Sequence, residues 1–392
     1  MISYSEALEN VLKTATDFGV EKIPLLESVG RVLDENITAD RDFPPFDRVT
    51  KDGIALNSDI LISKKKTINI EAIFAAGSQE GILKNKNNCV EIMTGAMLPK
   101  NTDTVIMYED ISIENGGATL KKSFSKGQNV HKKGSDRKAG EVILKKNRKI
   151  TAREIGVLAT VGKTEILVKK LPKIAVISTG DELISIDRTP LPHQIRSSNN
   201  YSLYAALAEE NIIPNLFHLK DEKTEMKDFL ENLVKEYDIL LLSGGVSKGK
   251  FDFLPGIFEE LKVEKIFHRV LQQPGKPLWF GKQEEEKTIV FSFPGNPVST
   301  FVNFHIYFKN WLRKSLQIEA KNEQVFLSEF ENTSTLTRFL LAEIISENEK
   351  LTAKLIEGNG SGDLISLTKA AGVVIIPPKT SIKNESVDFI KF

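Results

Sequence analysis

Three short segments of small and hydroxyl-bearing residues each follow an apolar run, and they are the best candidates for a ligand site. They are 178–182 (Ser-Thr-Gly-Asp-Glu), 243–247 (Ser-Gly-Gly-Val-Ser) and 293–297 (Phe-Pro-Gly-Asn-Pro). Small residues let backbone N–H groups approach an anion closely. In the third segment Asn296 suits a helix N-cap and Pro297 the first helical position, so the helix dipole would favour a phosphate there.

Tight turns alone would explain any one of these segments. Three of them after three apolar runs favour a binding site for an anionic ligand. None matches the G-x-G-x-x-G or the P-loop pattern, so the sequence supports neither a dinucleotide fingerprint nor a Walker site.

Carboxylates accompany these segments. Asp181 and Glu182 belong to the first, Asp221 stands between the first and the second, and Asp252 comes just after the second. An isolated carboxylate is usually a solvated surface group, but oxygen ligands shared with substrate phosphates are what Mg²⁺ requires. Lys276 lies between Pro274 and Pro277, in a stiff loop where its ammonium group could neutralise an oxyanion.

Other catalytic chemistries find little support. The five histidines lack metal-motif spacing, and neither a Ser-His-Asp nor a Cys-His arrangement can be built. Cys89 is the single cysteine, so an intramolecular disulfide and a thiolate zinc site are excluded, and its expected role is to fill a core. This cysteine usage, the absence of a signal-peptide pattern and the lack of any apolar stretch near 18 residues predict a cytoplasmic location.

The charge balance excludes a general nucleic-acid or membrane binder, because 53 basic and 53 acidic residues give a formal net charge of zero. One segment departs from this balance: residues 121–149 hold 11 Lys or Arg against Asp136 and Glu141. A solvated face is the usual meaning of such a run, and an anionic ligand or acidic partner is the sharper alternative.

The elements that must position these residues indicate a multidomain chain of α/β plus β class. Strands alternate with helices from Lys173 to a helix that starts at Pro297, which predicts a doubly wound α/β domain with a parallel sheet. Short alternating apolar runs predict small β domains over 54–130 and after Asn322. Capping boxes at Ser3 and Thr151 predict helices outside the first of these β domains. The predicted domains are a discontinuous helical and extended stem (1–45 and 132–171), an inserted β domain (46–131), the α/β domain (172–318) and a C-terminal β domain (319–392).

Taken together, the motifs resemble those of the molybdopterin molybdotransferase family, to which MoeA and the gephyrin E-domain belong. The resemblance covers essentially the whole chain. The matching segments, in order, are Phe43-Pro44-Pro45-Phe46-Asp47 with Asp52-Gly53, residues 91–96, Asn129-Val130 with Gly134 and Asp136, residues 178–183, residues 243–247, Pro274-Gly275-Lys276-Pro277 and residues 294–299.

The resemblance implies an elongated homodimer of four domains, with a MogA/MoaB-like pterin-binding α/β domain and a small C-terminal domain similar to a β-barrel. It implies a transferase of molybdenum cofactor biosynthesis that cleaves adenylylated molybdopterin, releases AMP and inserts molybdate into the dithiolene, assisted by Mg²⁺. Expected partners are the upstream molybdopterin adenylyltransferase and molybdoenzyme acceptors, with no nucleic acid and no membrane.

The resemblance also implies roles for individual residues. The catalytic residues would be Asp52, Thr94, Asp136, Glu182, Asp221, Asp252 and Lys276, of which Asp221 and Asp252 would bind the metal. The pterin and its phosphates would be bound by Ser178, Gly180, Gly244, Gly245, Ser247, Pro274, Gly275, Pro277, Pro294, Gly295, Asn296, Ser299, Arg338 and Ser361. Within these sets, Lys276, Ser299, Arg338 and Ser361 would form an oxyanion pocket covered by the C-terminal domain. Asp52, Thr94 and Asp136 would reach the site from the second subunit.

Several positions depart from the family pattern. Arg48-Val49-Thr50-Lys51 stands where the family often has Asn-Ser-Ala-Met. Gln273 replaces a second Lys of many members, Ser197 replaces a common Asp, and Lys250 replaces a common acidic residue. These changes leave the cation geometry open, and molybdate and tungstate, both tetrahedral dianions, cannot be told apart. A non-catalytic pterin-binding scaffold or cofactor-delivery protein remains an alternative, as does a molybdopterin adenylyltransferase. The retained carboxylates favour the enzyme over a scaffold, and the two β domains disfavour the adenylyltransferase.

Overall fold

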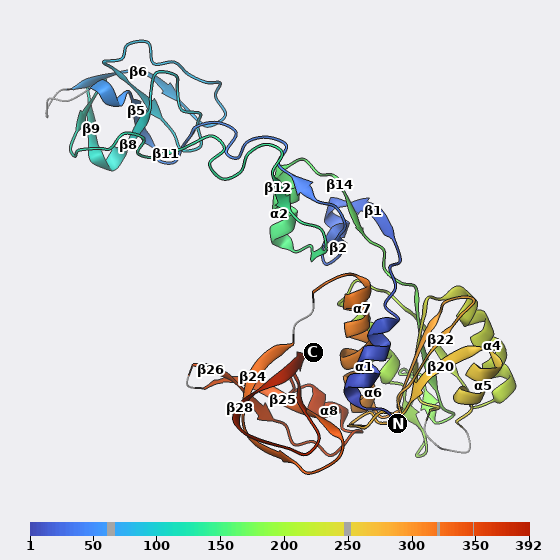
Figure 1. The fold of residues 1–392 in the computed structure, drawn as a ribbon. Coiled ribbons are helices and arrows are strands. Elements are labelled where there is room, and N and C mark those ends of the chain that lie inside the picture. The colour runs from blue at the N-terminus through green and yellow to red at the C-terminus, as the bar shows by residue number, and fades with distance from the viewer. Residues whose placement is uncertain (61–66, 247–251, 320–321, 348) are drawn as a thin grey trace. The chain divides into compact units, whose positions relative to one another are not determined.

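The computed structural model describes residues 1–60, 67–246, 252–319, 322–347 and 349–392, whose elements are labelled in Figure 1. The chain divides into two compact units. Unit 1 comprises Met1–Asp34, Asn147–Ala152 and Glu165–Phe392, and unit 2 comprises Glu35–Lys146 and Arg153–Thr164. Among the described residues, no helix combines the length and the apolar character needed to cross a membrane.

A six-stranded sheet in unit 1 carries the candidate ligand segments. Its strands, in pairing order, are β18 (Asn215–Leu219), β15 (Ile174–Thr179), β19 (Ile239–Ser243), β23 (Ile289–Phe293), β22 (Trp279–Gln283) and β20 (Val263–His268). The first four run parallel. Strand β22 runs antiparallel to both of its neighbours, β23 and β20, so the expectation of a parallel sheet is wrong at this edge. Only residues 284–288 separate β22 from β23, whereas a parallel pairing needs a crossover of about a dozen residues or more.

Both faces of this sheet are buried, because side chains alternate along each strand. On β15, Ile174 and Val176 belong to the larger core, and Ala175 and Ile177 belong to a second core on the opposite face. The helices that contribute to the larger core are α1 (Tyr4–Lys13), α3 (Asn199–Ala208), α6 (Pro297–Asn303) and α7 (Lys309–Ser315), and those of the second are α4 (Lys223–Glu236) and α5 (Leu254–Glu260). The domain is therefore doubly wound, as the sequence predicts.

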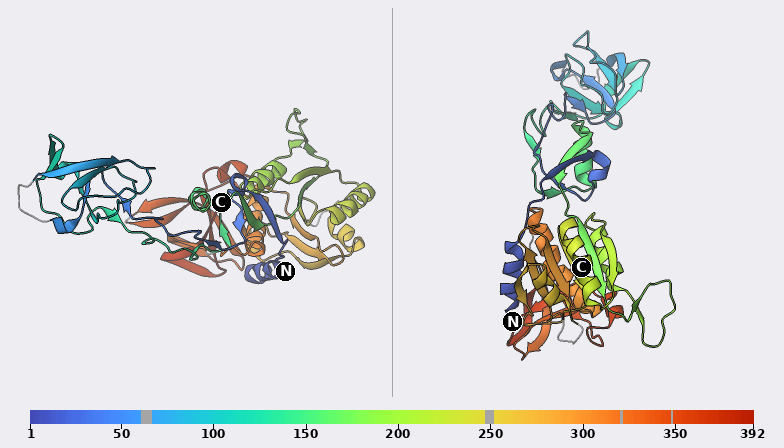
Figure 2. Two further views of the ribbon diagram at one scale, coloured as in Figure 1. Left: turned by 90° about the horizontal axis from the view of Figure 1, so that it is seen from above. Right: turned by 90° about the vertical axis from the view of Figure 1, so that its right-hand side faces the viewer.

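Helix α1 confirms the first capping box. The Ser3 side chain accepts a hydrogen bond from the Glu6 backbone N–H at 3.2 Å, and Ala7 and Val11 are fully buried. The helix packs beside α7, as the views in Figures 1 and 2 agree. The N-terminus of the chain is thus part of the α/β core.

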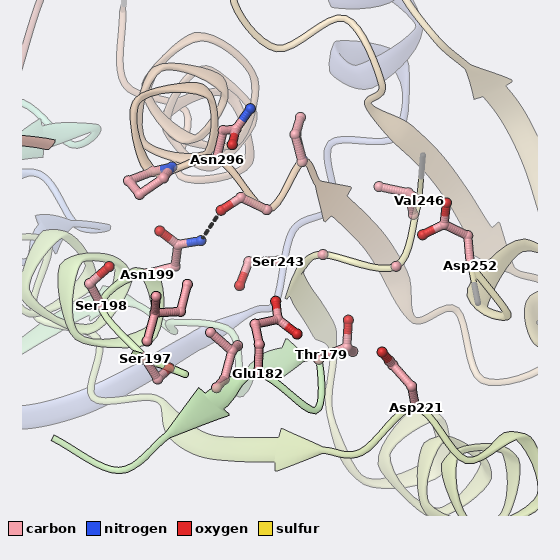
Figure 3. A pocket seen from close by; sticks show the side chains of 18 of the residues that line it. Thr179, Glu182, Ser197, Ser198, Asn199, Asp221, Ser243, Val246, Asp252 and Asn296 are labelled. Atoms are coloured by element: carbon pink, nitrogen blue, oxygen red, sulfur yellow. Dashed lines mark hydrogen bonds between the residues drawn. The ribbon is translucent and has the colours of Figure 1, made fainter. Parts of the chain in front are cut away.

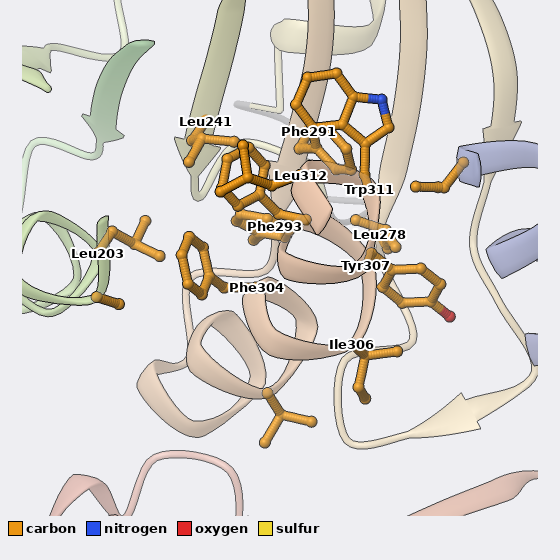
Figure 4. Packing of buried hydrophobic residues seen from close by; sticks show 14 of the residues in the cluster. Leu203, Leu241, Leu278, Phe291, Phe293, Phe304, Ile306, Tyr307, Trp311 and Leu312 are labelled. Atoms are coloured by element: carbon orange, nitrogen blue, oxygen red, sulfur yellow. The ribbon is translucent and has the colours of Figure 1, made fainter. Parts of the chain in front are cut away.

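Aromatic side chains cluster in the larger core around β23 and the helices that follow it (Figure 4). Phe291 of β23 contacts Phe308 and Trp311 edge-on, with ring centroids 5.6 and 6.1 Å apart. Helix α6 continues through a π turn, η4 (Phe304–Phe308), into α7. Each such buried side chain contributes about 1.5–3 kcal/mol, so this core holds α6 firmly against the strand whose end it follows.

The C-terminal residues form a barrel-like sheet. Its strands, in pairing order, are β21 (Gln272–Gln273), β25 (Thr337–Glu347), β26 (Lys350–Leu355), β24 (Glu323–Asn332), β28 (Thr380–Lys391) and β27 (Gly372–Ile376). Strand β25 also pairs with β27, which closes the sheet on itself. Strand β21 comes from the α/β segment, so the barrel is joined by backbone pairing to the loop that contains Lys276.

A smaller four-stranded sheet of unit 1 contains residues of the predicted stem. Its strands, in pairing order, are β1 (Val20–Pro24), β14 (Glu165–Lys169), β2 (Val32–Leu33) and β13 (Arg148–Lys149), and η1 (Leu25–Ser28) follows β1. The buried Lys169 ammonium lies 3.0 Å from Asp17 and 3.2 Å from Asp34.

Helix α2 (Ala152–Thr160) starts after Thr151, and Gly162 follows it with a φ of 73°, as the second capping box and the C-cap glycine predict.

Unit 2 is mostly β structure. Its main sheet, in pairing order, contains β8 (Thr104–Met107), β5 (Gly53–Leu56), β7 (Cys89–Ile92), β6 (Ile68–Phe74), β10 (Gly117–Leu120) and β9 (Ile111–Glu114), with the short turns η2 (Ser58–Ile60) and η3 (Tyr108–Asp110). Two further ladders pair β11 (Val130–His131) with β4 (Arg48–Val49) and β12 (Val142–Leu144) with β3 (Ile37–Thr38). Cys89 is fully buried in a core of this sheet, and burial raises the pKa of its thiol to about 12, which confirms its role as core filler.

Candidate functional site

A cavity of about 470 Å³ opens where β15, β19 and β23 end (Figure 3). Ser178 of β15 is the register partner of Ser243, which is in turn the partner of Phe293, so the three strands end at one level. All three glycine-rich segments therefore meet at the carboxyl edge of the sheet, where open α/β sheets bind ligands.

Ten of the residues proposed from the sequence line this cavity. They are Gly180, Glu182, Asp221, Gly244, Gly245, Asp252, Pro277, Pro294, Gly295 and Asn296. Ser247 and Lys250 lie outside the described residues. Ser178, Pro274, Gly275, Lys276, Ser299, Arg338 and Ser361 do not line it, and Asp52, Thr94 and Asp136 belong to unit 2.

Thr179, rather than Ser178, faces the cavity. Ser178 is fully buried; its Oγ accepts a hydrogen bond from Asn200 Nδ2 (3.1 Å) and lies 3.1 Å from His218 Nδ1. The expectation that Ser178 binds the ligand is therefore off by one residue. Adjacent side chains of a strand point in opposite directions, so Thr179 faces the cavity and Ser178 does not. Thr179 Oγ1 is buried and has no hydrogen-bond partner within the described part of the chain, so a ligand group would satisfy it.

Thr179 and Leu254 explain the glycines of the second segment. A Cβ at Gly244 would lie 2.8 Å from Thr179 Oγ1, and one at Gly245 would lie 2.7 Å from Leu254 Cδ1 and 3.1 Å from Thr179 Oγ1. Both glycines also have positive φ, 99° and 70°. Larger residues would therefore be strained and would fill the space beside the unpartnered hydroxyl.

Asp221 is surrounded by other carboxylates. Burial, followed by the charges of Asp181, Glu182 and Asp252, raises the pKa of Asp221 above its usual value. The Asp221 backbone N–H donates to Asp181 Oδ1 at 3.2 Å. Figure 3 shows Asp221 and Asp252 at the same end of the cavity. A bound cation would relieve this crowding of negative charge.

The donor set fits Mg²⁺ rather than a metal held by protein alone. No group of three or more His, Cys, Asp or Glu side chains within the described ranges is arranged to hold an ion. Mg²⁺ commonly takes one or two carboxylates and completes its shell with water and substrate phosphates. Glu182, Asp221 and Asp252 line the cavity, and Asp221 and Asp252 are the pair expected from the sequence to supply the carboxylates.

Residues 195–199 also line the cavity, and of these the sequence connected only Ser197, a departure from the family pattern, with the cation geometry. Strand β17 (Ile195–Arg196) pairs in parallel with β16 (Leu183–Ile184), which returns the chain to the end of β15. Asn199 then donates to the Gly295 carbonyl oxygen at 2.8 Å, the dashed line in Figure 3. The available signal was the Ser198-Asn199 pair at the start of a helix, but the ladder that brings it to the cavity is not visible locally.

The start of α6 differs from the expected phosphate site. The Val298 backbone N–H donates to the Ser361 carbonyl oxygen at 3.0 Å, and Pro297 has no N–H. Asn296 makes no side-chain cap bond to the helix; its Nδ2 donates to Ser361 Oγ at 2.9 Å instead. The glycine-rich segment around Ser361 therefore covers the first turn of α6 and uses an amide that a phosphate would need.

Lys276, Ser299 and Arg338 lie on three neighbouring elements beside the cavity. Gln273 of β21 is the register partner of Arg338 on β25. Arg338 Nε is buried and, within the described ranges, has no hydrogen-bond partner. Ser299 is almost fully buried on α6. Strand pairing therefore links the loop of Lys276 to the strand of Arg338, and the pocket that these residues are expected to form stays a prediction.

The three candidates in unit 2 lie around one segment of that unit. The Thr94 backbone N–H donates to Asp52 Oδ1 at 2.6 Å, and this bond lowers the pKa of Asp52. Asp136 Oδ1 lies 2.8 Å from His131 Nε2, and His131 Nδ1 lies 3.2 Å from a terminal nitrogen of Arg48. Both carboxylates, Asp52 and Asp136, are exposed on this unit.

Local ion pairs account for much of the basic run at 121–149. Lys126 pairs with Asp103 at 3.3 Å and Lys132 with Asp47 at 2.8 Å. Lys122 also pairs with Asp110. This pairing favours the solvated face over a site for an anionic ligand.

Comparison with known proteins identifies the family. Residues 2–162 match the MoeA N-terminal region (domain I and II), and residues 175–314 match a probable molybdopterin binding domain. The chain is 37% identical over 383 residues to a molybdopterin molybdenumtransferase of Synechocystis, with 96% of each chain covered. It is 31% identical over 394 residues to that of Bacillus subtilis, with 97% of this chain and 91% of the relative covered.

The same likeness extends to the solved fold. The molybdopterin biosynthesis MoeA protein from Pyrococcus horikoshii superposes with a TM-score of 0.83 at 28% identity, with 100% of both chains covered. Sequence, domain order and fold agree over the whole length. The chain therefore belongs to the molybdopterin molybdenumtransferase family.

Proposed function

We propose that this protein inserts molybdate into adenylylated molybdopterin and releases AMP, as a transferase of molybdenum cofactor biosynthesis. The observation that carries the proposal is the meeting of three glycine-rich strand ends and three carboxylates, Glu182, Asp221 and Asp252, in one cavity of about 470 Å³. A cavity of this size suits a ligand of cofactor dimensions. Membership of the family supports the substrate class.

The groups that line the cavity and those that lie beside it have distinct parts in the proposal. Gly180, Gly244 and Gly295 leave room for the phosphates. The unpartnered Thr179 hydroxyl donates a hydrogen bond to a phosphate oxygen. Asn199 and Asn296, which also line the cavity, orient the substrate. Lys276, Ser299 and Arg338 attract the tetrahedral oxyanion.

Mg²⁺ belongs to the proposal as the expected cation. Asp221 and Asp252 would hold it together with substrate phosphates. The ion would supply positive charge against the phosphate oxygens. The raised pKa of Asp221 supports this role, because a site built for a cation crowds negative charge while the cation is absent.

A homodimer belongs to the proposal as well. Asp52, Thr94 and Asp136 are assigned to catalysis by family resemblance, and we propose that they act in a site completed by a second subunit. The upstream adenylyltransferase and the molybdoenzyme acceptors are the protein partners that the reaction calls for.

The deciding experiment measures AMP released from adenylylated molybdopterin, with and without added molybdate and Mg²⁺. Molybdate-dependent release supports the proposal. Incubation with ATP and molybdopterin in place of the adenylylated substrate tests for an adenylyltransferase instead. A folded protein that binds the adenylylated substrate without releasing AMP would be a scaffold, which would refute the proposal.

A further inference from the structure

Three polar side chains are buried together beneath the loop that carries Lys276. Gln272, Asn303 and Tyr307 are each fully buried, and Tyr307 lies in the aromatic core seen in Figure 4. Polar groups at such depth are costly unless they are hydrogen-bonded. Their partners therefore indicate what the cluster stabilises.

The cluster is a chain of hydrogen bonds that runs in one direction. The Tyr307 hydroxyl donates to Gln272 Oε1. Gln272 Nε2 donates to Asn303 Oδ1 at 2.7 Å and to the Pro274 carbonyl oxygen at 3.0 Å. Asn303 Nδ2 donates to the Gly275 carbonyl oxygen at 3.2 Å. The chain starts in the core and ends on the backbone of the loop.

Three successive carbonyls of the loop are held in this way. Those of Pro274 and Gly275 accept from the cluster, and that of Lys276 accepts from the Val270 backbone N–H at 3.0 Å. Pro274 and Pro277 have no N–H to donate. Gly275 has a φ of 86°, and a Cβ there would collide with the Asn303 amide. The position of the loop thus depends on Gln272 and Asn303.

The same cluster joins the other two elements of the oxyanion pocket. Ser299 stands four residues before Asn303 on α6, so both project from one helix face. Gln272 and Gln273 pair with Thr337 and Arg338 on β25. One buried network therefore connects the loop of Lys276, the helix of Ser299 and the strand of Arg338.

We propose that Gln272, Asn303 and Tyr307 form a positioning network that sets the spacing of Lys276, Ser299 and Arg338 for a tetrahedral oxyanion. None of the three touches the oxyanion itself. The inference rests on the proposed function, because it assigns the network to the molybdate half of that reaction. Groups that orient directly bound residues commonly change ligand affinity by about 10–100-fold when they are removed.

The test compares three size-conserving variants. Asn303→Leu removes the hydrogen bonds of Asn303 to Gln272 and to the Gly275 carbonyl oxygen. Tyr307→Phe removes only the hydrogen bond from Tyr307 to Gln272. Thr288→Val is the matched control: Thr288 is as deeply buried and donates to the carbonyls of Val234 and Tyr237 (2.6 and 3.0 Å), at the start of β23 and away from the cavity. Thermal unfolding measures the stability lost in each.

The kinetic readout separates positioning from general destabilisation. We expect Asn303→Leu to raise the KM for molybdate about tenfold, with kcat and the KM for adenylylated molybdopterin within about threefold of wild type. Tyr307→Phe should give a smaller rise, and it decides the matter if Asn303→Leu does not fold. Thr288→Val should leave all three constants unchanged. Wild-type constants in both network variants, or equal changes in all three variants, would overturn the inference.

Hydrogen exchange gives a readout that does not depend on activity. Peptides that cover residues 270–280 should exchange faster in Asn303→Leu than in wild type, and at the wild-type rate in Thr288→Val. Unchanged exchange would refute the network even in an active enzyme. Absence of molybdate-dependent AMP release in wild type would refute the proposed function, while faster exchange in Asn303→Leu would still support the network's hold on the loop.

Discussion

Asn296 donates a hydrogen bond to Ser361 across 65 positions of sequence, and the Ser361 carbonyl oxygen accepts from the Val298 N–H in the first turn of α6, the helix that follows Asn296. These hydrogen bonds join the segment around Ser361, in the C-terminal part of the chain, to α6. The contact links the cavity wall to the expected oxyanion pocket, because Asn296 lines the cavity and Ser299 lies one turn further along the helix.

Ser361→Ala should loosen this connection. Loss of one hydrogen bond should lower the free energy of unfolding by about 0.5–1.5 kcal/mol, and the KM for molybdate should rise because the first turn of α6 loses a contact. Thr368→Ala is the control, since it removes a side-chain bond to a nearby carbonyl of the same segment, that of Ile365. A molybdate KM that is equal in the two variants would contradict the role given to Ser361.

Asp252→Ala should abolish turnover and leave the fold intact, because it removes a cation-facing carboxylate rather than a packed side chain. We expect kcat/KM for AMP release to fall at least about 100-fold. The control is Asp228→Ala, an exposed carboxylate on α4. Circular dichroism checks folding, and normal molybdate-dependent AMP release by folded Asp252→Ala would rule out the assignment.

Asp221 should destabilise the protein at neutral pH in the absence of Mg²⁺. Its pKa is raised in the folded state, so folding favours the protonated form. The penalty is therefore absent below the ordinary Asp pKa, develops as pH rises toward the folded pKa, and is complete above it. Asp221→Asn should be more stable than wild type at pH 7 by no more than about 1 kcal/mol, and the difference should vanish on acidification.

Thermal unfolding with and without Mg²⁺ across pH measures this effect. Added Mg²⁺ should stabilise wild type more than Asp221→Asn, because the variant lacks one of the two carboxylates. If Asp221→Asn is less stable than wild type at pH 7 without Mg²⁺, the carboxylate is held by favourable contacts and the interpretation is wrong.

Lys276 and Arg338 should carry most of the attraction for molybdate, because Gln273 is uncharged. Lys276→Ala or Arg338→Ala should weaken molybdate binding about tenfold or more, and wild-type affinity should fall with salt as the Debye length shortens. Gln273→Lys should tighten binding by about fivefold, near 1 kcal/mol. Lys262→Ala, which removes an exposed lysine, is the control. Unchanged molybdate affinity in both alanine variants at low salt would place the pocket elsewhere.

Mixing two inactive proteins tests the homodimer. If each site takes Asp52 from one subunit and Asp252 from the other, an Asp52→Ala and Asp252→Ala heterodimer keeps one intact site. Equal mixing with full subunit exchange makes half of the dimers heterodimers, so about a quarter of wild-type activity should return. Absence of recovery despite proven exchange would contradict the shared site.

Local patterns in the sequence were enough for most elements and for the carboxylates of the cavity. The continuous apolar run over residues 174–177 predicted β15 because a strand buried on both faces needs apolar residues throughout. The capping box at Ser3 predicted the start of α1 because its hydrogen bond joins residues three apart. Glu182, Asp221 and Asp252 were placed at the cavity because parallel strands end at a common edge.

Tertiary structure decided what depends on partners distant in sequence. Whether Ser178 or Thr179 faces the cavity is a matter of register, and a shift of one residue reverses a strand side chain. Three further features likewise depend on pairing and burial between segments that are distant in sequence. They are the antiparallel edge of the sheet, the return of residues 195–199 to the cavity, and the cluster of Gln272 with Tyr307. The sequence by itself determined which chemistry the chain carries; packing between remote segments decided which of those groups share a site, because burial gives each polar side chain its partners only when the core closes.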